Sequence, residues 1–447
     1  MRIIGVLLLT LSAITPASSV FVIVPGVIAQ AGSGAFLSML AAALLAVPIA
    51  YVYAELSSAY PIAGGEYSIV GRAVGHSFGF AALGLTVAGS MLSPAVLALG
   101  ASDYIAVVIP GLDQTAVAIA IIAVTTLLGI LHIRTNAWVT GVFLLLELLA
   151  LTALAGLGFW NAQRSLWEIV AHPVVVSDQA LQATPLAMIG LATSVAIFAY
   201  YGYSAAVYFA EETHEAPRVV ARTILWALVI TVIAELVPVT AVLIGAPDLK
   251  ALLASQNPFS DFVAATGGRW FSIAISLSVA LAIFNAVLAT VMQNARFFYS
   301  TGRDVAWHPR INNAFMVTHD RFNSPWIATL AAGIFSMAAC FLGLQLLLVV
   351  TGTSIAIVYA IMCIAAIVGR RSGASRHAAY RMPLYPFLPV IGLLALAYVF
   401  YTSAMDPAVG QPSLIANAVI IVLSLIYYVV VIRRKGPWTM RDPEKDS

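Results

Sequence analysis

The sequence predicts an all-α integral membrane protein with twelve transmembrane helices, and two observations carry this prediction. Of its 447 residues 62% are hydrophobic and only 9% are charged, whereas a soluble domain carries roughly 25% charged residues. The apolar residues also gather in runs of about 20, the length that a helix needs to cross a bilayer. So few charges cannot supply the polar surface of a soluble fold of this length.

Apolar runs of this length recur along the whole chain. They cover residues 3–29, 35–56, 78–109, 115–132, 137–160, 186–210, 223–245, 270–300, 326–345, 346–369, 387–404 and 413–432. The first, third and eighth runs exceed what a straight span needs, so we expect them to be tilted or broken. No alternation typical of strands competes with the helices, and no segment of domain size remains. We therefore treat residues 1–447 as one transmembrane domain.

The positions of Lys and Arg predict the orientation. If the N-terminus is cytoplasmic and the spans alternate, only Arg164, Lys250 and Arg269 of the 21 basic residues fall outside. Because basic residues concentrate in cytoplasmic loops, we expect both termini in the cytoplasm and the chain in the inner or plasma membrane. The net charge of +2 argues against a nucleic-acid partner, and nothing indicates an obligate protein partner beside the lipid bilayer.

The two cysteines, Cys340 and Cys363, lie in separate apolar runs. They are too few for a metal set, and on neighbouring spans their depths would differ by about 10 Å. We expect both to pack in the core, with no disulfide and no metal site.

The first apolar run is interrupted by Thr15-Pro16-Ala17-Ser18-Ser19. This stretch imitates a signal-peptide cleavage region, but cleavage here would leave a stump too short to span, so we disfavour that interpretation. Proline removes one backbone donor and frees the carbonyl four residues earlier. Unpaired backbone groups cost several kcal/mol each in hydrocarbon, so the stretch is either a kink sealed by hydroxyls or part of a site.

A break in the first run predicts a particular kind of site. If the helix restarts near Ser19, the N–H groups of Ser18, Ser19 and Val20 lie at the positive end of a half-helix and can receive an anion. Transporters use this arrangement for a substrate carboxylate.

The sixth run carries a second interruption, residues 199–204, around Gly202. Glycine costs roughly 1 kcal/mol in a helix interior. The first and sixth runs open two blocks of five spans, residues 3–160 and 186–369, and an odd number of spans inverts the second block. Interruptions at corresponding positions of two inverted halves indicate a substrate site at the membrane midplane.

Three segments resemble one transporter family. They are "YAELSSAYPIAGGEYSIVGRAVG" at residues 53–75, "FAYYGYSAAVYFAEETHEAPR" at 198–218, and "FNAVLATVMQNARFFYSTGRD" at 284–304 followed by "FNSPW". In this order they resemble the amino acid–polyamine–organocation (APC) permeases. The resemblance implies a LeuT-like fold with a five-plus-five inverted repeat, broken first and sixth helices, and two additional C-terminal helices at residues 387–432. It also implies secondary transport of amino acids or amines held between the breaks, by proton coupling or exchange.

Carried over residue by residue, the family's Gly-Ser-Gly in the first break falls on Ala17, Ser18 and Ser19. Both glycines are absent, and glycine there lets a carboxylate approach the backbone, so the substrate class stays open. Gly202 keeps the glycine of the sixth span, and Phe198 or Tyr201 falls where an aromatic side chain covers the substrate. The candidate substrate contacts are Thr15, Ala17, Ser18, Ser19, Val20, Phe198, Ala199, Tyr201, Gly202 and Ser204.

Two carboxylates, Glu147 and Glu235, lie well inside apolar runs. A carboxylate there either takes up a proton or pairs with a cation, and either behaviour suits a coupling group. Some members of the family carry a lysine in the fifth span in place of a bound sodium ion, and Glu147 aligns within about a turn of it. The alternative for both is a protonated structural hydrogen bond, which Pro238 favours for Glu235.

Several charged residues fall at the cytoplasmic ends of the runs. We expect them to form ion pairs that latch an inner gate, the alternative being solvated loop charge. They are Glu55, Glu66, Arg72, Glu211, Glu212, Arg303 and Asp304.

The sequence thus predicts a secondary active transporter that imports an amino acid or small amine by alternating access. We expect proton symport, with sodium coupling not excluded and no cofactor. Exchange is the alternative, and a nutrient sensor or channel on the same fold is a further one. No catalytic motif supports a membrane enzyme.

Overall fold

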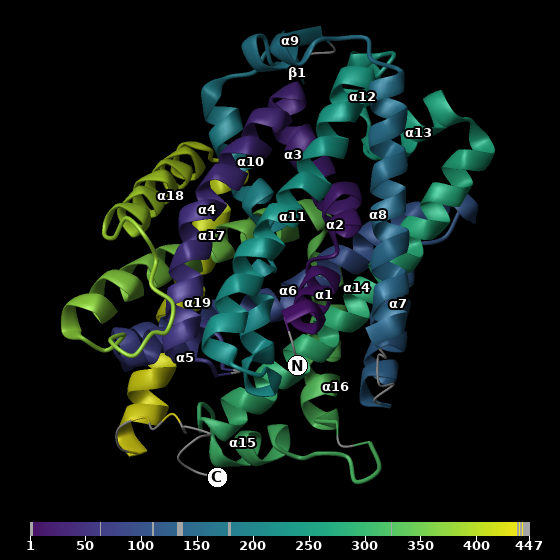
Figure 1. The fold of residues 1–447 in the computed structure, drawn as a ribbon. Helices are drawn as coiled ribbons and strands as arrows, with labels where there is room; N and C mark the ends of the chain where they lie inside the picture. Colours follow the sequence, from purple (N-terminus) through teal and green to yellow (C-terminus); the bar gives the residue numbers. More distant parts are fainter. Residues whose placement is uncertain are drawn as a thin grey trace.

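The computed structural model describes residues 3–62, 64–109, 111–131, 137–177, 180–322, 324–435, 438 and 440. Almost all of it is helical (Figure 1). The first half contains α1 (Ile3–Ile14), α2 (Pro16–Ser18), the π-helix η1 (Ser19–Ile23), α3 (Val24–Ala31), η2 (Gly32–Gly34), α4 (Ala35–Ala59), α5 (Glu66–Ala73), α6 (His76–Val108), α7 (Gln114–Ile130), α8 (Ala137–Trp160) and α9 (Leu166–Ala171).

The second half begins with a short hairpin and continues as helices. It contains β1 (Val174–Ser177), β2 (Ala180–Ala183), α10 (Leu186–Ala199), η3 (Tyr203–Glu212), α11 (Ala216–Gly245), α12 (Leu249–Ala254), α13 (Pro258–Gly267), α14 (Arg269–Arg303), α15 (Pro309–Phe315), α16 (Trp326–Ala339), η4 (Cys340–Leu342), α17 (Leu344–Ser372), α18 (Phe387–Met405), α19 (Gly410–Tyr427), η5 (Tyr428–Ile432) and η6 (Arg433–Lys435).

The helices confirm an integral membrane protein. In the described residues, nine helical runs are long and apolar enough to cross a bilayer, and the first of them, Ile3–Ala59, contains two helical legs around Gly32–Gly34. Two further apolar helices, Gln114–Ile130 and Trp326–Leu342, are shorter. Helices therefore occupy every predicted apolar run, while the count of twelve crossings and the inverted repeat stay predictions.

The prediction of a chain without strands is wrong at one place. β1 and β2 pair antiparallel, with Val174 opposite Ala183 and Ser177 opposite Ala180. The Val174 amide donates to the Ser33 hydroxyl at 2.8 Å. Gly32, whose φ is +59°, leaves room for the Val174 carbonyl, since a Cβ there would collide with it. The hairpin thus packs on the turn that follows α3.

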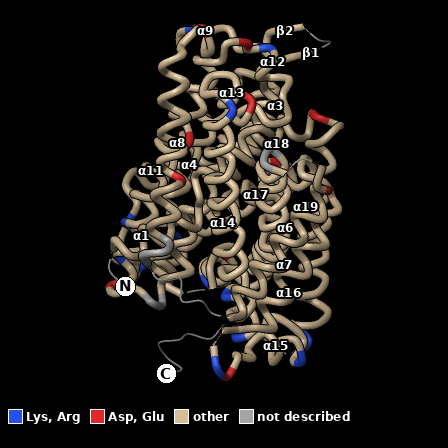
Figure 2. The backbone as a smooth tube through the Cα atoms, turned by 90° about the vertical axis from the view of Figure 1, so that its right-hand side faces the viewer, with Lys and Arg blue, Asp and Glu red and all other residues tan. Residues whose placement is uncertain are grey.

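Lys and Arg collect at the two ends of the bundle and leave the middle nearly free of charge. Figure 2 shows most of them at the end that carries α15, and a few near α9, α12 and α13. Arg164 and Lys250 share one groove with residues of β1 and α9 at that second end. This distribution agrees with the predicted orientation, which itself stays a prediction.

The crossing of α8 and α11 depends on backbone contact. A Cβ on Gly158 would collide with the backbone of Ala241, and a Cβ on Gly245 would collide with the carbonyl of Gly158. Small residues let membrane helices approach until their backbones touch. This close contact sets the spacing between the two helices that carry Glu147 and Glu235.

We expect Gly158→Ala to lower the thermal unfolding temperature of the detergent-solubilised protein, because overpacking a close contact costs about 1–3 kcal/mol. Gly156→Ala is the matched control on the same helix, since nothing lies within 4 Å of its Cβ position. It should leave the unfolding temperature unchanged or raise it slightly, because alanine is the better helix former. Equal effects of the two substitutions would contradict the close crossing.

Candidate functional site

The first predicted break is present, and it consists of a single residue. α1 ends at Ile14 and α2 begins at Pro16, with Thr15 between them in the left-handed region at φ 49°. The Thr15 amide donates to the Leu11 carbonyl at 3.0 Å, and its hydroxyl donates to the Ile14 carbonyl at 2.8 Å. Left-handed backbone at a non-glycine residue costs about 1–3 kcal/mol. The packing around Thr15 therefore holds a strained conformation in place.

The second break lies between α10 and η3 and faces the first. Gly202 has φ +123°, and a Cβ on it would lie 2.9 Å from Cγ1 and 3.1 Å from Cα of Ile14. Both the backbone conformation and the contact with the last residue of α1 require glycine here. The glycine that the family resemblance singled out is therefore where the two broken helices meet.

One hydrogen bond joins the two breaks. The Ser19 hydroxyl donates to the Ala199 carbonyl at 2.9 Å, and both residues are buried. Ala199 is the last residue of α10, where backbone carbonyls lose their helical partners. Ser19, which replaces a family glycine, thus satisfies a carbonyl that the second break exposes.

A cavity of about 90 Å³ lies beside the two breaks. By the same measure a water molecule needs roughly 10–15 Å³, so in this conformation the cavity has room for several waters or a small solute. Its lining includes six of the ten candidate substrate contacts: Thr15, Ser19, Phe198, Tyr201, Gly202 and Ser204. Most of the remaining lining comes from α6, α14 and α17, and Glu66 of α5 and Tyr208 of η3 contribute as well.

The other four candidates, Ala17, Ser18, Val20 and Ala199, are buried outside the cavity lining. The helix resumes at Pro16, three residues earlier than the sequence suggested, so its first N–H groups belong to Ala17 and Ser18. The Ser19 amide instead donates to the Thr15 carbonyl at 3.1 Å. The predicted anion receptor of Ser18, Ser19 and Val20 is therefore not formed as expected.

Sequence reasoning missed most of the cavity wall. Polar residues line it from α6 (Thr86, Ser90, Ser93), α14 (Thr290, Gln293, Asn294) and α17 (Thr351, Ser354). Apart from the adjacent Gln293 and Asn294, these residues are spaced by three, four or seven, which is the spacing of one helix face. Polar residues in apolar spans were a signal available in the sequence. The side-chain amide of Asn294 also donates to the backbone carbonyl of Ser90 at 2.5 Å, which fixes α14 against α6.

The two predicted coupling carboxylates lie behind the first break. Glu147 on α8 and Glu235 on α11 are 1% and 0% exposed, and neither carboxyl has a hydrogen-bond partner among the described residues. Glu147 faces the backbone of Ala17, and Glu235 faces the hydroxyl of Ser19. Both carboxyls thus approach the residues that restart the first helix, without lining the cavity.

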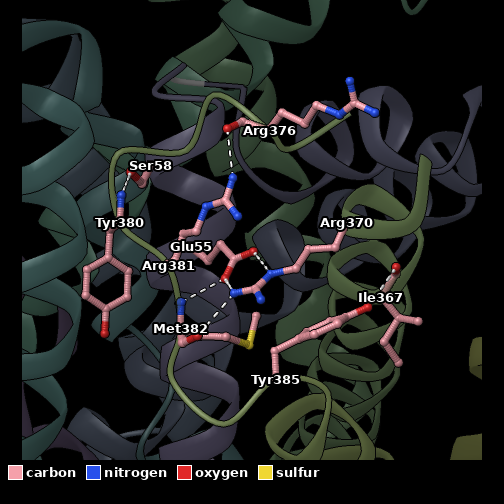
Figure 3. Close-up of polar contacts among 9 residues, drawn as sticks. All are labelled: Glu55, Ser58, Ile367, Arg370, Arg376, Tyr380, Arg381, Met382 and Tyr385. Carbon is pink, nitrogen blue, oxygen red and sulfur yellow. Dashed lines mark hydrogen bonds and ion pairs between the residues drawn. The ribbon is translucent and has the colours of Figure 1, made fainter. Parts of the chain in front are cut away.

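Of the predicted gate residues, Glu55 forms an ion pair with a basic side chain (Figure 3). Arg370 on α17 donates to both of its carboxylate oxygens, at 2.6 and 2.5 Å, and the Met382 amide donates to the second at 2.8 Å. The Arg370 guanidinium also lies 4.2 Å from the ring centre of Tyr385. These contacts, which we call the Glu55 staple, fasten the segment after α17 to the end of α4.

The other gate candidates are placed differently. Glu66 is buried and accepts from two tyrosines instead of a basic side chain. The Arg72 guanidinium donates to the Ser68 hydroxyl. Nε of Arg303 lies 3.9 Å from Oδ1 of Asp304. Glu211 and Glu212 end η3, and their side chains lie outside the described part. An inner gate built from these charges stays a prediction.

A bundle of apolar helices with a cavity beside two interrupted helices is the arrangement that secondary transporters use. A profile of the family described as amino acid permease matches residues 3–426, and the chain belongs to this family.

Curated relatives of similar length carry transporter names. An uncharacterized transporter of Mycobacterium tuberculosis is 26% identical over 84% of this chain and 80% of its own length. The branched-chain amino acid permease BcaP of Lactococcus lactis is 25% identical over 86% and 85%, respectively. The methylthioribose transporter of Bacillus subtilis is 24% identical over 85% and 83%. These names support transport over catalysis, and they differ in the solute carried.

Replacing one partner of the Glu55 staple should strongly destabilise the protein. We expect Glu55→Gln or Arg370→Gln to cost about 3–5 kcal/mol, because each leaves a charge without its buried partner. The measurement is thermal unfolding in detergent. Arg371→Gln is the control, since Arg371 is the exposed neighbour of Arg370. The double variant should cost less than the sum of the singles, and strict additivity would show that the pair contributes nothing.

Proposed function

We propose that this protein is a secondary active transporter that imports an amino acid or a small amine by alternating access, taking up the solute in the cavity beside the two breaks. The observation that carries the proposal is this cavity, lined by Thr15 and Ser19 of the first broken helix and by Gly202 of the second. Membership of the amino acid permease family supports it. Its proposed setting is the inner or plasma membrane, with both ends of the chain in the cytoplasm.

The lining favours a solute with an ammonium group and an apolar part. Among the described lining residues, Glu66 is the only carboxylate and none is Lys, Arg or His. Tyr201, Tyr208 and Phe198 offer aromatic faces, which attract cations, and Ile14 and Ile355 add aliphatic surface. A zwitterionic amino acid fits if its carboxylate meets backbone or hydroxyl donors at the breaks. A plain amine fits without that requirement.

For energy coupling we propose a proton bound at Glu147, with sodium coupling and exchange as the alternatives. A buried carboxyl without a partner is most stable in its neutral form, and ionising it requires a new partner. Glu147 faces the backbone of Ala17, so a change in its charge acts on the helix restart directly. This is the arrangement that a coupling group needs.

Proteoliposome assays test the transport class. We expect uptake of an amino acid or amine and counterflow against preloaded solute, with Gly202→Ala inactive because a Cβ there meets Ile14. A channel would show flux without counterflow, a sensor would bind without flux, and an obligate exchanger would need internal solute. Absence of binding and flux across a panel of amino acids and amines would contradict the proposal.

The coupling role has its own variant. Glu147→Gln should abolish the pH dependence of uptake while leaving exchange detectable, because glutamine mimics the protonated carboxyl. The measurement is initial uptake between pH 5 and pH 8, with and without preloaded solute. Glu168→Gln, at an exposed position of α9, is the control and should behave as the parent does. Parental pH dependence in Glu147→Gln would remove Glu147 from the coupling step.

A further inference from the structure

Glu66 is the one carboxylate among the described residues of the cavity lining, and its hydrogen bonds point to a role beyond attracting an ammonium group. It is the first residue of α5, is 2% exposed and contributes to the cavity lining. Its two carboxylate oxygens accept from different hydroxyls, Tyr53 at 3.2 Å and Tyr208 at 2.7 Å. Glu66 therefore lines the cavity as a hydrogen-bonded carboxylate. It is separate from the two residues, Thr15 and Gly202, at which the helices break.

These hydrogen bonds join three parts of the bundle. Tyr53 belongs to α4, Glu66 to α5 and Tyr208 to η3, the part of the sixth run that follows Gly202. Gly65 makes the contact with η3 possible, because a Cβ there would lie 2.7 Å from Cε1 and 2.9 Å from the hydroxyl of Tyr208. Together they form a tie, which we call the Glu66 tie. Figure 1 shows α5 toward the end of the bundle that carries α15, the predicted cytoplasmic end.

Five phenols from three segments of the chain surround Glu66. Tyr53 from α4, Tyr201, Tyr203 and Tyr208 from the sixth run and Tyr359 from α17 interact with it. A tyrosine hydroxyl keeps its proton below about pH 10. Glu66 is therefore the group in this cluster of tyrosines whose charge can change below about pH 10.

Burial raises the pKa of the Glu66 carboxyl above its usual range, and the hydrogen bonds from Tyr208 and Tyr53 oppose that shift in part. The direction follows from desolvation, which disfavours the charged form. The protonation change thus moves from the acidic range toward neutral pH.

Protonation changes what the Glu66 tie can hold. The ionised carboxylate accepts both hydroxyls in charge-assisted hydrogen bonds, which are stronger than neutral ones. The neutral acid carries a hydrogen on one oxygen, so that oxygen becomes a donor and the charge assistance is lost from both bonds. The tie among α4, α5 and η3 is therefore weaker when Glu66 is protonated.

We propose that Glu66 is a proton-binding site on the cytoplasmic side of the cavity whose ionised form holds that side closed through Tyr53 and Tyr208, and whose protonated form releases it. The inference rests on the proposed transport function for its meaning in a cycle, but its test needs no transport. Glu66 acts through the two tyrosines and is a positioning residue for the closure.

The test measures access to the cavity from solution as a function of pH. Ala205 lines the cavity on η3, and Cys340 and Cys363 are both buried, so Ala205→Cys in a Cys340→Ala, Cys363→Ala background gives one reporter thiol. Its rate of labelling by a charged maleimide is divided by that of Asn313→Cys, an exposed position on α15. This ratio removes the pH dependence of the thiol itself.

In the parent we expect the labelling ratio to rise about tenfold from pH 8 to pH 5, because protonation removes the charge assistance from both hydrogen bonds of the Glu66 tie. Glu66→Gln should give the high ratio at both pH values. Tyr208→Phe should raise the ratio at pH 8 but keep part of the pH dependence, because Tyr53 still donates to Glu66. These three outcomes together separate a titrating tie from a merely structural contact.

Parental pH dependence in Glu66→Gln would overturn the proposal, as would a ratio in the parent that does not change with pH. If Glu66→Gln does not fold, the Tyr53→Phe, Tyr208→Phe double variant replaces it and should be insensitive to pH, since it keeps the carboxyl but has no tie. Retained pH dependence there also overturns the proposal. Failure of uptake in proteoliposomes would contradict the transport function and leave these labelling results unaffected.

Discussion

The hydrogen bond from the Ser19 hydroxyl to the Ala199 carbonyl is 2.9 Å long. It satisfies a backbone carbonyl that a broken helix would otherwise leave unpaired. A bilayer offers no water to backbone groups, so a helix can stop at membrane depth only where protein groups or a cavity satisfy what it leaves unpaired. In this protein, the first broken helix supplies a hydrogen-bond donor to the second where the second one stops. Gly202 packs on Ile14, Ser19 reaches the end of α10, and the cavity lies beside the two breaks.

The carboxylates around this centre differ in how firmly they are held, and the difference suggests separate roles. Glu55 binds Arg370 through both oxygens and a backbone amide as well, so it behaves as a permanent fastening of α4 to the segment after α17. Glu66 accepts from two tyrosine hydroxyls in the described part of the chain, and we propose that these contacts weaken when it takes up a proton. Glu147, like Glu235, is buried without a formed hydrogen bond in the described part of the chain, and it lies beside Ala17, where the first helix restarts. In the proton-driven cycle that we propose, Glu55 would be a fixed contact, Glu66 a titratable one and Glu147 the coupling group.

The features that depend on local backbone chemistry, above all the two helix breaks, could be predicted from the sequence. Proline at position 16 and glycine at position 202 marked both breaks, because one removes a backbone donor and the other tolerates positive φ. The start of the second helix segment at Pro16 could also have been predicted from the sequence, because proline favours the first position of a helix. Long-range partners were not predictable. Arg370 lies 315 residues from Glu55, and only the packed fold decides which of many arginines reaches it. The hairpin after α9 was missed because its four-residue strands are too short to show alternation.

The central claim is that the transported solute binds in the cavity beside the two breaks. Protection of a cavity-wall thiol by solute tests it most directly. With Ser90→Cys on the α6 wall, in the same background without native cysteines, saturating solute should slow labelling several-fold, with half-protection at the solute's own dissociation constant. A lipid-facing cysteine should be unaffected. Labelling of Ser90→Cys that does not change at solute concentrations saturating transport would place the binding site elsewhere and contradict the account.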